Sequence, residues 1–236
     1  KNHVELAESL GLADFERAAK VSGNGFYFLK GDLGVLNQAL LRFALDFMQK
    51  KGYVYVEPPL LIHKKILNAA INAEEFAQSI YSIEGEDLAL IGTSEHSLLG
   101  LHAGEALPEQ EFPQKYFSYS MCFRKEIGSH GINEKGLWRR HQFNKVEQFI
   151  FCAQEESEKY FQELLQNSED ILQALELPYR VVAICTADMG WADARQIDIE
   201  TWMPGQNQYR ETHTADLMTD YQSRRLNTKF KCSSPT

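Results

Sequence analysis

The chain has 236 residues, of which 44% are hydrophobic, so it can bury a sizeable core as one large domain spanning residues 1–236. The net charge of −9 argues against a generally basic, nucleic-acid-coating surface. No run approaches the ~18 apolar residues of a membrane span, and the polar start lacks a signal-peptide core. The four cysteines show no C-x-x-C pair or zinc spacing, so we expect free thiols and a reducing cytoplasm.

The N-terminal part predicts helices joined by short strands. Short helices are expected over residues 4–10 and 14–21, followed by a strand at FYFLKG. Asp32 is expected to cap a longer helix, because the apolar residues after it recur at helical spacing. These apolar residues are Leu36, Leu40, Phe43 and Phe47. A strand between residues 52 and 61 then ends at two prolines.

The next segment leads to a short polar sequence, Thr93-Ser94-Glu95. A helix is expected over residues 64–78, with Ile66 and Phe76 facing inward, and a strand over residues 88–92. The polar sequence opens the following helix. Its local interpretation is Thr93 as N-cap and Glu95 as an acidic residue that the helix dipole favours in the first turn.

Residues 115–126 and 139–152 alternate between apolar and polar side chains, which predicts an antiparallel hairpin. Arg124 and Glu126 share a face of the first strand because they are two residues apart. One face of the second strand carries Arg139, His141, Phe143, Lys145 and Glu147. Unpaired charges on a covered sheet face are costly, so this surface suits an anionic ligand that contains a ring. The long glycine-containing connection is typical of a functional loop.

The C-terminal part predicts a helix over residues 155–175 and strands over 179–186, 196–202 and 206–213. A last helix over residues 220–227 is expected at the surface. Helices that flank an antiparallel sheet indicate an α+β fold.

Several motifs carry a family resemblance. FRKE, GSHGINEKGL and RRHQFNKVE resemble motif 2 of the class II aminoacyl-tRNA synthetases, and HQFNKVE is similar to the seryl-tRNA synthetases in particular. The helix and strand within residues 36–61 resemble motif 1, which implies a homodimer interface. TSE resembles the T-x-E motif, NQYRETHT the YRE(I/V)SS element, and ADMGW the G-D-M-G turn, with Ala187 in place of glycine.

The resemblance implies a class II fold and an ATP-dependent reaction that converts serine to seryl-adenylate and passes it to tRNA(Ser). Arg124 would bridge the serine carboxylate and the α-phosphate, since a planar guanidinium suits two oxyanions. Glu126 would accept from the adenine amino group, and Phe143 would stack on the ring. Arg124 and Glu211 are the implied catalytic residues. Glu211 and Thr214 would hold Mg²⁺, although the family usually has serine where Thr214 stands.

The implied binding sites are larger sets. Serine would be bound by Thr93, Ser94, Glu95, Arg124 and Glu147. ATP would be bound by Arg124, Lys125, Glu126, Arg140, Phe143, Glu211, Thr212, His213 and Thr214.

Two features of the family are missing from the sequence: the N-terminal helical arm that grips tRNA, and motif 3, whose arginine contacts the γ-phosphate. We therefore expect the polypeptide to bind ATP weakly without forming seryl-adenylate efficiently. A fragment, a sequence without its downstream residues and a degenerate paralogue all fit this pattern.

Three other functions compete with serine activation. A T-x-E synthetase for threonine or proline fits less well, because HQFNKVE points to the seryl type. A non-catalytic dimeric paralogue would have no reason to keep costly charges on the sheet. Aminoacylation of a carrier protein would suit a core without the arm, but the enzymes of that kind resemble a zinc-dependent type, and no zinc ligand set is visible.

Overall fold

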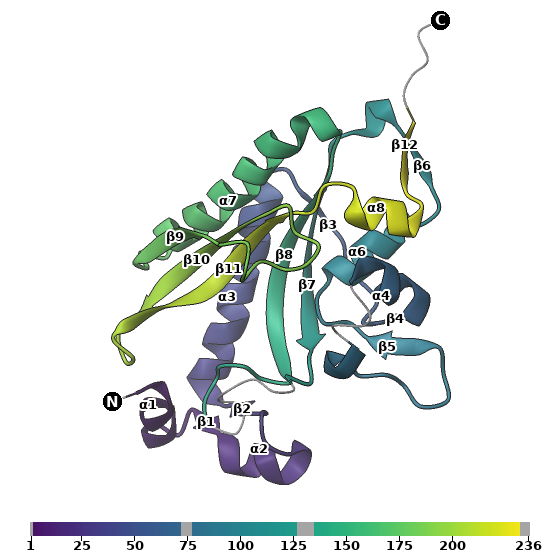
Figure 1. Ribbon diagram of the computed structural model, residues 1–236. Coiled ribbons are helices and arrows are strands. Elements are labelled where there is room, and N and C mark those ends of the chain that lie inside the picture. The colour runs from purple at the N-terminus through teal and green to yellow at the C-terminus, as the bar shows by residue number, and fades with distance from the viewer. Residues whose placement is uncertain (1, 72–76, 127–134, 232–236) are drawn as a thin grey trace, which may run out of the picture.

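The computed structural model describes residues 2–71, 77–126 and 135–231, and a long hairpin forms its centre (Figure 1). β7 (Gln114–Phe123) pairs antiparallel with β8 (Gln142–Phe151), in a register that runs from Gln114 opposite Phe151 to Phe123 opposite Gln142. β3 (Val54–Tyr55) adds a parallel pairing to β7. The predicted hairpin and the α+β class are confirmed, and residues 127–134 of the connection lie outside the described residues.

The two faces of the hairpin are covered by different helices. Directly opposed residues share a face, and Phe117 points toward α3 (Gly31–Lys50) and α7 (Ser157–Ala174), where it packs with Met48 and Tyr53. On the other face, Phe149 and Phe151 pack against α4 (Lys64–Ala70), α6 (Glu95–Leu101) and α8 (Tyr221–Leu226). Figure 1 shows these two groups of helices on opposite sides of the hairpin.

A second antiparallel sheet has the strand order β11-β10-β9. Its strands are β9 (Tyr179–Ala183), β10 (Arg195–Met203) and β11 (Gln208–Leu217). Ile197, Ile199 and Ala215 form one core cluster with Phe161 and Leu165 of α7. The opposite face of this sheet is therefore left to polar residues.

Smaller elements surround these layers. β4 (Leu61–His63) pairs with β5 (Leu88–Leu90), which leads into the T-x-E segment. β12 (Lys229–Lys231) pairs in parallel with β6 (Ala106–Pro108), a pairing that local patterns did not predict. The remaining helices and strands are α1 (His3–Ser9), β1 (Ala13–Asp14), α2 (Phe15–Ser22) and β2 (Phe28–Leu29), with 3-10 turns at Ala77–Ser79, Glu109–Glu111 and Gln154–Glu156.

Three local predictions need correction. The helix α3 starts at Gly31 with Lys30 as N-cap, so Asp32 lies in the first turn and is not the cap. The helix α4 ends at Ala70, and Phe76 lies outside the described residues, whereas Ile66 packs against the core as predicted. The expected surface helix α8 buries Gln222 and Leu226.

Within the described ranges, no helix is long and apolar enough to cross a bilayer.

Candidate active site

The T-x-E segment lies against the end of the hairpin. Arg124 Nε donates to the Gly92 carbonyl at 3.1 Å, which joins the segment to the end of β7. Thr93 and Ser94 are 5% and 0% exposed. The N-cap of α6 is Ser94, and no side chain caps this helix. The hydroxyl of Thr93 therefore does not cap the helix as its local sequence suggested, because it bonds to Glu147 instead.

Glu147 is the centre of a compact polar cluster. Its Oε2 accepts hydrogen bonds from the Thr93 hydroxyl, from Ser94 Oγ at 2.7 Å and from the Glu95 backbone N–H at 3.0 Å. Lys145 Nζ donates to Glu147 Oε1 at 2.9 Å and to Thr93 Oγ1 at 2.8 Å. The Thr93 hydroxyl thus accepts from the ammonium and donates to the carboxylate, and one network joins β8 to the start of α6.

This network separates the pKa values of two neighbouring carboxyls. Burial alone would raise the pKa of Glu147, but the charge of Lys145 and the hydrogen bonds from Thr93 and Ser94 outweigh it, so this pKa lies well below 4.5. Burial and then the charge of Glu147 raise the pKa of Glu95, which the hydrogen bond from Gln222 only partly opposes. One carboxyl is firmly ionised, and the other is poised to gain or lose a proton. Different environments often assign two such carboxyls different roles.

The remaining residues of the predicted face lie beside this cluster. In the observed register Phe143 is opposite Cys122 and Glu147 is opposite Ser118, so Phe143 and Glu147 share a face. The Arg124 guanidinium carbon lies 5.3 Å from the centre of the Phe143 ring. The face therefore offers an aromatic surface, a cation and an anionic cluster in succession.

Glu126 follows β7 and has a side chain that is only 12% exposed. Arg139 Nη1 lies 3.7 Å from its Oε2. Both residues have positive φ, 49° and 48°. The chain thus leaves and re-enters the hairpin through left-handed conformations that non-glycine residues seldom adopt, and strand parity does not extend to these two positions.

Two predicted ATP residues point elsewhere. Lys125 Nζ lies 5.6 Å from the centre of the Tyr81 ring. Arg140 is 4% exposed, and its Nε donates to the Trp138 carbonyl at 2.5 Å. Arg140 also lines a cavity of about 250 Å³ against α2, together with Phe15, Glu16, Ala19, Asn24, Gly25, Phe26 and Lys135. The structure does not bring Lys125 and Arg140 to the face of Arg124.

The predicted magnesium ligands lie on the polar face of the second sheet. Thr214 is opposite Asp198, and Glu211 is opposite Glu200. Burial and the charge of Asp198 raise the pKa of Glu211. These neighbouring oxygen donors fit a hard cation such as Mg²⁺. Within the described ranges, no group of three or more His, Cys, Asp or Glu side chains is arranged to hold a metal ion.

A β-bulge separates Thr212 and His213 from that face. The register shifts between Ile199 and Glu200, and His213 pairs with Ile199, which belongs to the core against α7. Thr212 Oγ1 lies 2.7 Å from the hydroxyl of the buried Thr201. Thr212 and His213 therefore face α7, and of the predicted set on β11 only Glu211 and Thr214 remain on the polar side.

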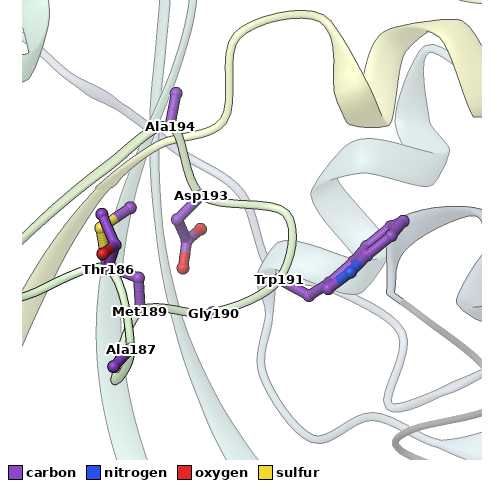
Figure 2. A pocket seen from close by; sticks show the side chains of 7 residues that line it. All are labelled: Thr186, Ala187, Met189, Gly190, Trp191, Asp193 and Ala194. Carbon is purple, nitrogen blue, oxygen red and sulfur yellow. The ribbon is translucent and has the colours of Figure 1, made fainter.

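The ADMGW turn forms an open pocket of about 480 Å³. It is lined by Thr186, Ala187, Met189, Gly190, Trp191, Asp193 and Ala194. Ala187 is not among the described residues with positive φ, so the turn does not require glycine there. Figure 2 shows the carboxylate of Asp193 directed into the pocket and Trp191 directed away from it. Burial raises the pKa of Asp193.

Asp216 is a further acidic group near Asp193. The backbone N–H of Ala194, which follows Asp193, donates to the carbonyl of Leu217, which follows Asp216, at 2.9 Å, and this bond brings the two segments together. Partial desolvation, followed by the charges of Asp193 and Glu95, raises the pKa of Asp216 above its usual range, although the residue is exposed at the surface.

Four residues of this region were missed as site residues: Lys145, Asp193, Asp216 and Gln222. Strand parity already placed Lys145 on the face of Glu147, so its role in the cluster could have been found from the sequence. The other three reach the site through contacts between distant segments, for which the local sequence carries no signal.

Known proteins are similar to this chain over nearly its whole length. A family described as "tRNA synthetase class II core domain (G, H, P, S and T)" matches residues 78–235. The serine–tRNA ligase of Pyrococcus furiosus is 49% identical over 231 residues, which cover 98% of this chain and 51% of the relative. The chain thus spans about half the length of the curated relatives it matches.

Two solved structures are also similar. The crystal structure of seryl-tRNA synthetase from Pyrococcus horikoshii complexed with ATP matches with a TM-score of 0.96 and 47% identity, covering 99% of this chain and 52% of that one. The cytoplasmic serine–tRNA ligase from Naegleria fowleri in complex with AMP matches with a TM-score of 0.94 and 39% identity, covering 98% of this chain and 55% of that one.

The role of Lys145 can be tested through the pH dependence of stability. In Lys145→Met, the ammonium group no longer opposes the effects of burial and of the Glu95 charge on Glu147. The pKa of folded Glu147 therefore rises above 4.5. A raised folded pKa costs stability as pH increases above the unfolded value. We expect a loss of about 2–3 kcal/mol in the free energy of unfolding near pH 8 and a clearly smaller loss near pH 5, measured by urea titration.

The exposed pair of Lys159 with Glu156 provides a matched control. Lys159→Met should cost less than about 1 kcal/mol at either pH. A loss for Lys145→Met that does not change with pH would contradict the assigned charge state of Glu147.

Proposed function

This chain belongs to the tRNA synthetase class II core domain family (G, H, P, S and T), and from that premise we propose that it is the catalytic core of a seryl-tRNA synthetase. The reaction is the ATP-dependent activation of serine, followed by transfer to tRNA(Ser). The observation that carries the proposal is the buried cluster around Glu147, because the T-x-E segment and the end of HQFNKVE meet there. The similarity to seryl enzymes over nearly the whole chain supports it.

The amino acid is proposed to bind at the Glu147 cluster. Thr93, Glu95 and Glu147 would receive the ammonium and hydroxyl of serine, and Ser94 helps to orient Glu147. A site built to hydrogen-bond a hydroxyl leaves buried polar groups unpaired when alanine enters. The cluster therefore supplies selection for serine as well as affinity.

The nucleotide is proposed to bind along the remainder of the face. The adenine would stack on Phe143, and its amino group would donate to Glu126, whose side chain is largely shielded from water. Arg124 lies between Phe143 and the serine site and could bind a serine carboxylate oxygen and an α-phosphate oxygen together. Catalysis would then rest on positioning and charge neutralisation.

Glu211 and Thr214 are the residues proposed to hold Mg²⁺. The bound cation would neutralise phosphate charge, while Arg124 and Arg139 approach the same region from the hairpin, as their influence on the pKa of Glu211 indicates. Thr214 offers the same hydroxyl donor as serine, so the substitution keeps the donor type.

We propose a cytoplasmic location for the protein. We also propose that it forms a homodimer. Val35, Leu36 and Leu40 of α3 are 68%, 63% and 47% exposed, and Val54 of β3 is 58% exposed. Apolar side chains gathered along one helix and its following strand are typical of a surface that another protein covers. This is the region that resembles motif 1.

Serine-dependent exchange of labelled pyrophosphate into ATP tests the proposed activity directly when this core is joined to a motif 3 segment, because without that segment we expect seryl-adenylate to form inefficiently. Serine should support exchange, and threonine, proline and alanine should not. Arg124→Ala should lower the rate by at least about 10²–10³-fold, because it removes a preorganised donor to the transition state. Arg124→Lys should recover little, since lysine lacks the planar fork.

Arg17→Ala is the matched control for this experiment, because Arg17 is 79% exposed and pairs only with Asp14 in the described part of the chain. It should leave exchange unchanged. Exchange that depends on threonine or proline would move the assignment to another synthetase. Tight binding of serine and ATP without exchange would favour a non-catalytic paralogue.

The dimer is testable by sedimentation at micromolar concentration. We expect a dimer for the parent chain and a monomer for Leu36→Glu combined with Leu40→Glu, because two charges would enter an apolar interface. The double variant should keep its far-UV circular dichroism, since both side chains are exposed in the protomer. A monomeric parent chain would contradict the proposed interface.

A further inference from the structure

Helix α8 reaches the T-x-E segment with one buried side chain. Gln222, its second residue, is 5% exposed. Its Nε2 donates to Glu95 Oε1 at 2.5 Å and lies 3.4 Å from the Ala70 carbonyl. Among the described residues, Gln222 is the one side chain that donates a hydrogen bond to the Glu95 carboxylate. A helix expected to lie at the surface thus contacts a residue of the proposed serine site.

The helix does not depend on this hydrogen bond for its position. Arg225 donates to the carbonyls of Ala69 at 2.9 Å and Ile71 at 3.2 Å, and also to that of Asn68. Leu226 is buried in the cluster that includes Ala70. These contacts hold α8 against the end of α4, so the contact with Glu95 is separable from the docking of the helix.

The surroundings of Glu95 are mostly acidic. Glu147 approaches from β8, Asp193 from the ADMGW turn and Asp216 from β11, and Lys145 is the nearby cation. Lys145 is already bonded to Glu147 and Thr93. Burial and the charge of Glu147 therefore favour the neutral form of Glu95, whereas a hydrogen bond donated to a carboxylate favours the ionised form.

We propose that Gln222 is a positioning residue that holds the Glu95 carboxylate oriented and charged for the ammonium of the substrate amino acid. The inference rests on the proposed function for the identity of that ligand, but the contact between Gln222 and Glu95 does not. Because the amide donates to one oxygen, the other oxygen keeps its lone pairs for the substrate.

Two substitutions separate the effects of donor and shape. Gln222→Met keeps most of the side-chain volume and removes the donor, so the pKa of Glu95 should rise. As the pH is lowered, serine binding should then be lost at a higher pH than in the parent chain. Gln222→Glu keeps the shape and adds a second carboxyl, so the rise should be larger. We expect the acid limb of serine affinity, measured by calorimetry across pH, to move up by about one unit for Gln222→Met.

At pH values well below the parent pKa of Glu95, which is about 7, this shift corresponds to serine affinity that is weaker by roughly tenfold. ATP affinity should stay within about twofold of the parent value, because Gln222 lies outside the proposed nucleotide face. The control is Arg225→Met on the same helix, which removes hydrogen bonds to the end of α4 while the packing of Leu226 and the Gln222 amide are kept. It should lower the thermal midpoint without moving the acid limb.

The titration of the Glu95 side-chain carbon gives a readout that is independent of substrate. The protein would carry ¹³C in its glutamate carboxyls, and the Glu95 signal would be assigned by its loss in Glu95→Gln. An upward shift of this titration in Gln222→Met supports the inference. An unmoved titration, or an equal shift in Arg225→Met, overturns it.

The same experiment separates the inference from the proposed function. If the parent chain bound no serine at any pH, the proposed function would fall, and the carbon titration alone would still decide the role of Gln222. If serine bound normally and neither Gln222 variant moved the limb, the proposed function would stand and the inference would fall.

Discussion

A carboxylate that remains charged in the protein interior must collect its hydrogen bonds from wherever the chain can supply them, and Glu147 shows the structural consequences. Its partners are Lys145 on the same strand and the Thr93-Ser94-Glu95 segment that follows β5. Removing a partner would leave a largely buried charge uncompensated, which is destabilising. This requirement fixes the start of α6 against the hairpin and defines one end of the site.

The same charge governs its neighbours. Burial and then the charge of Glu147 make Glu95 hard to ionise, and the hydrogen bond from Gln222 of α8 opposes both effects. The second sheet adds Asp193 and Asp216 at the rim, so this end of the site attracts an ammonium group. Arg124 and Phe143 stand at the other end, where phosphate and a purine ring would bind. The proposed function thus places an amino acid and a nucleotide along one gradient of charge on a single sheet face.

The sequence predicted the parts of this arrangement that depend on short-range periodicity. The two-residue period of the hairpin placed Arg124, Phe143 and Glu147 on one face. The register confirms this for Phe143 and Glu147, and the Arg124 guanidinium carbon lies 5.3 Å from the centre of the Phe143 ring. The two-residue period does not continue along β11, because a β-bulge at Ile199 and Glu200 breaks the alternation and leaves Thr212 and His213 on the other face from Glu211 and Thr214. Bulges depend on the pairing of two strands and leave no clear mark on either one. Propensity also favoured Thr93 as a helix cap, but tertiary contact with Glu147 overrode it.

The family resemblance supplied the expected roles of the site residues, and the structure brings only some of these residues together. Glu126 follows β7, and Glu211 and Thr214 lie on the polar face of the second sheet, whereas Lys125 and Arg140 point toward Tyr81 and α2. Gln222 could not be found from the sequence, because the 127 positions that separate it from Glu95 are bridged only by the fold.

A crystal structure with a sulfamoyl analogue of seryl-adenylate is the most direct test of the proposed site. We expect the serine ammonium and hydroxyl within hydrogen-bond distance of Thr93, Glu95 and Glu147, with adenine stacked on Phe143. An analogue bound away from the Glu147 cluster would contradict it.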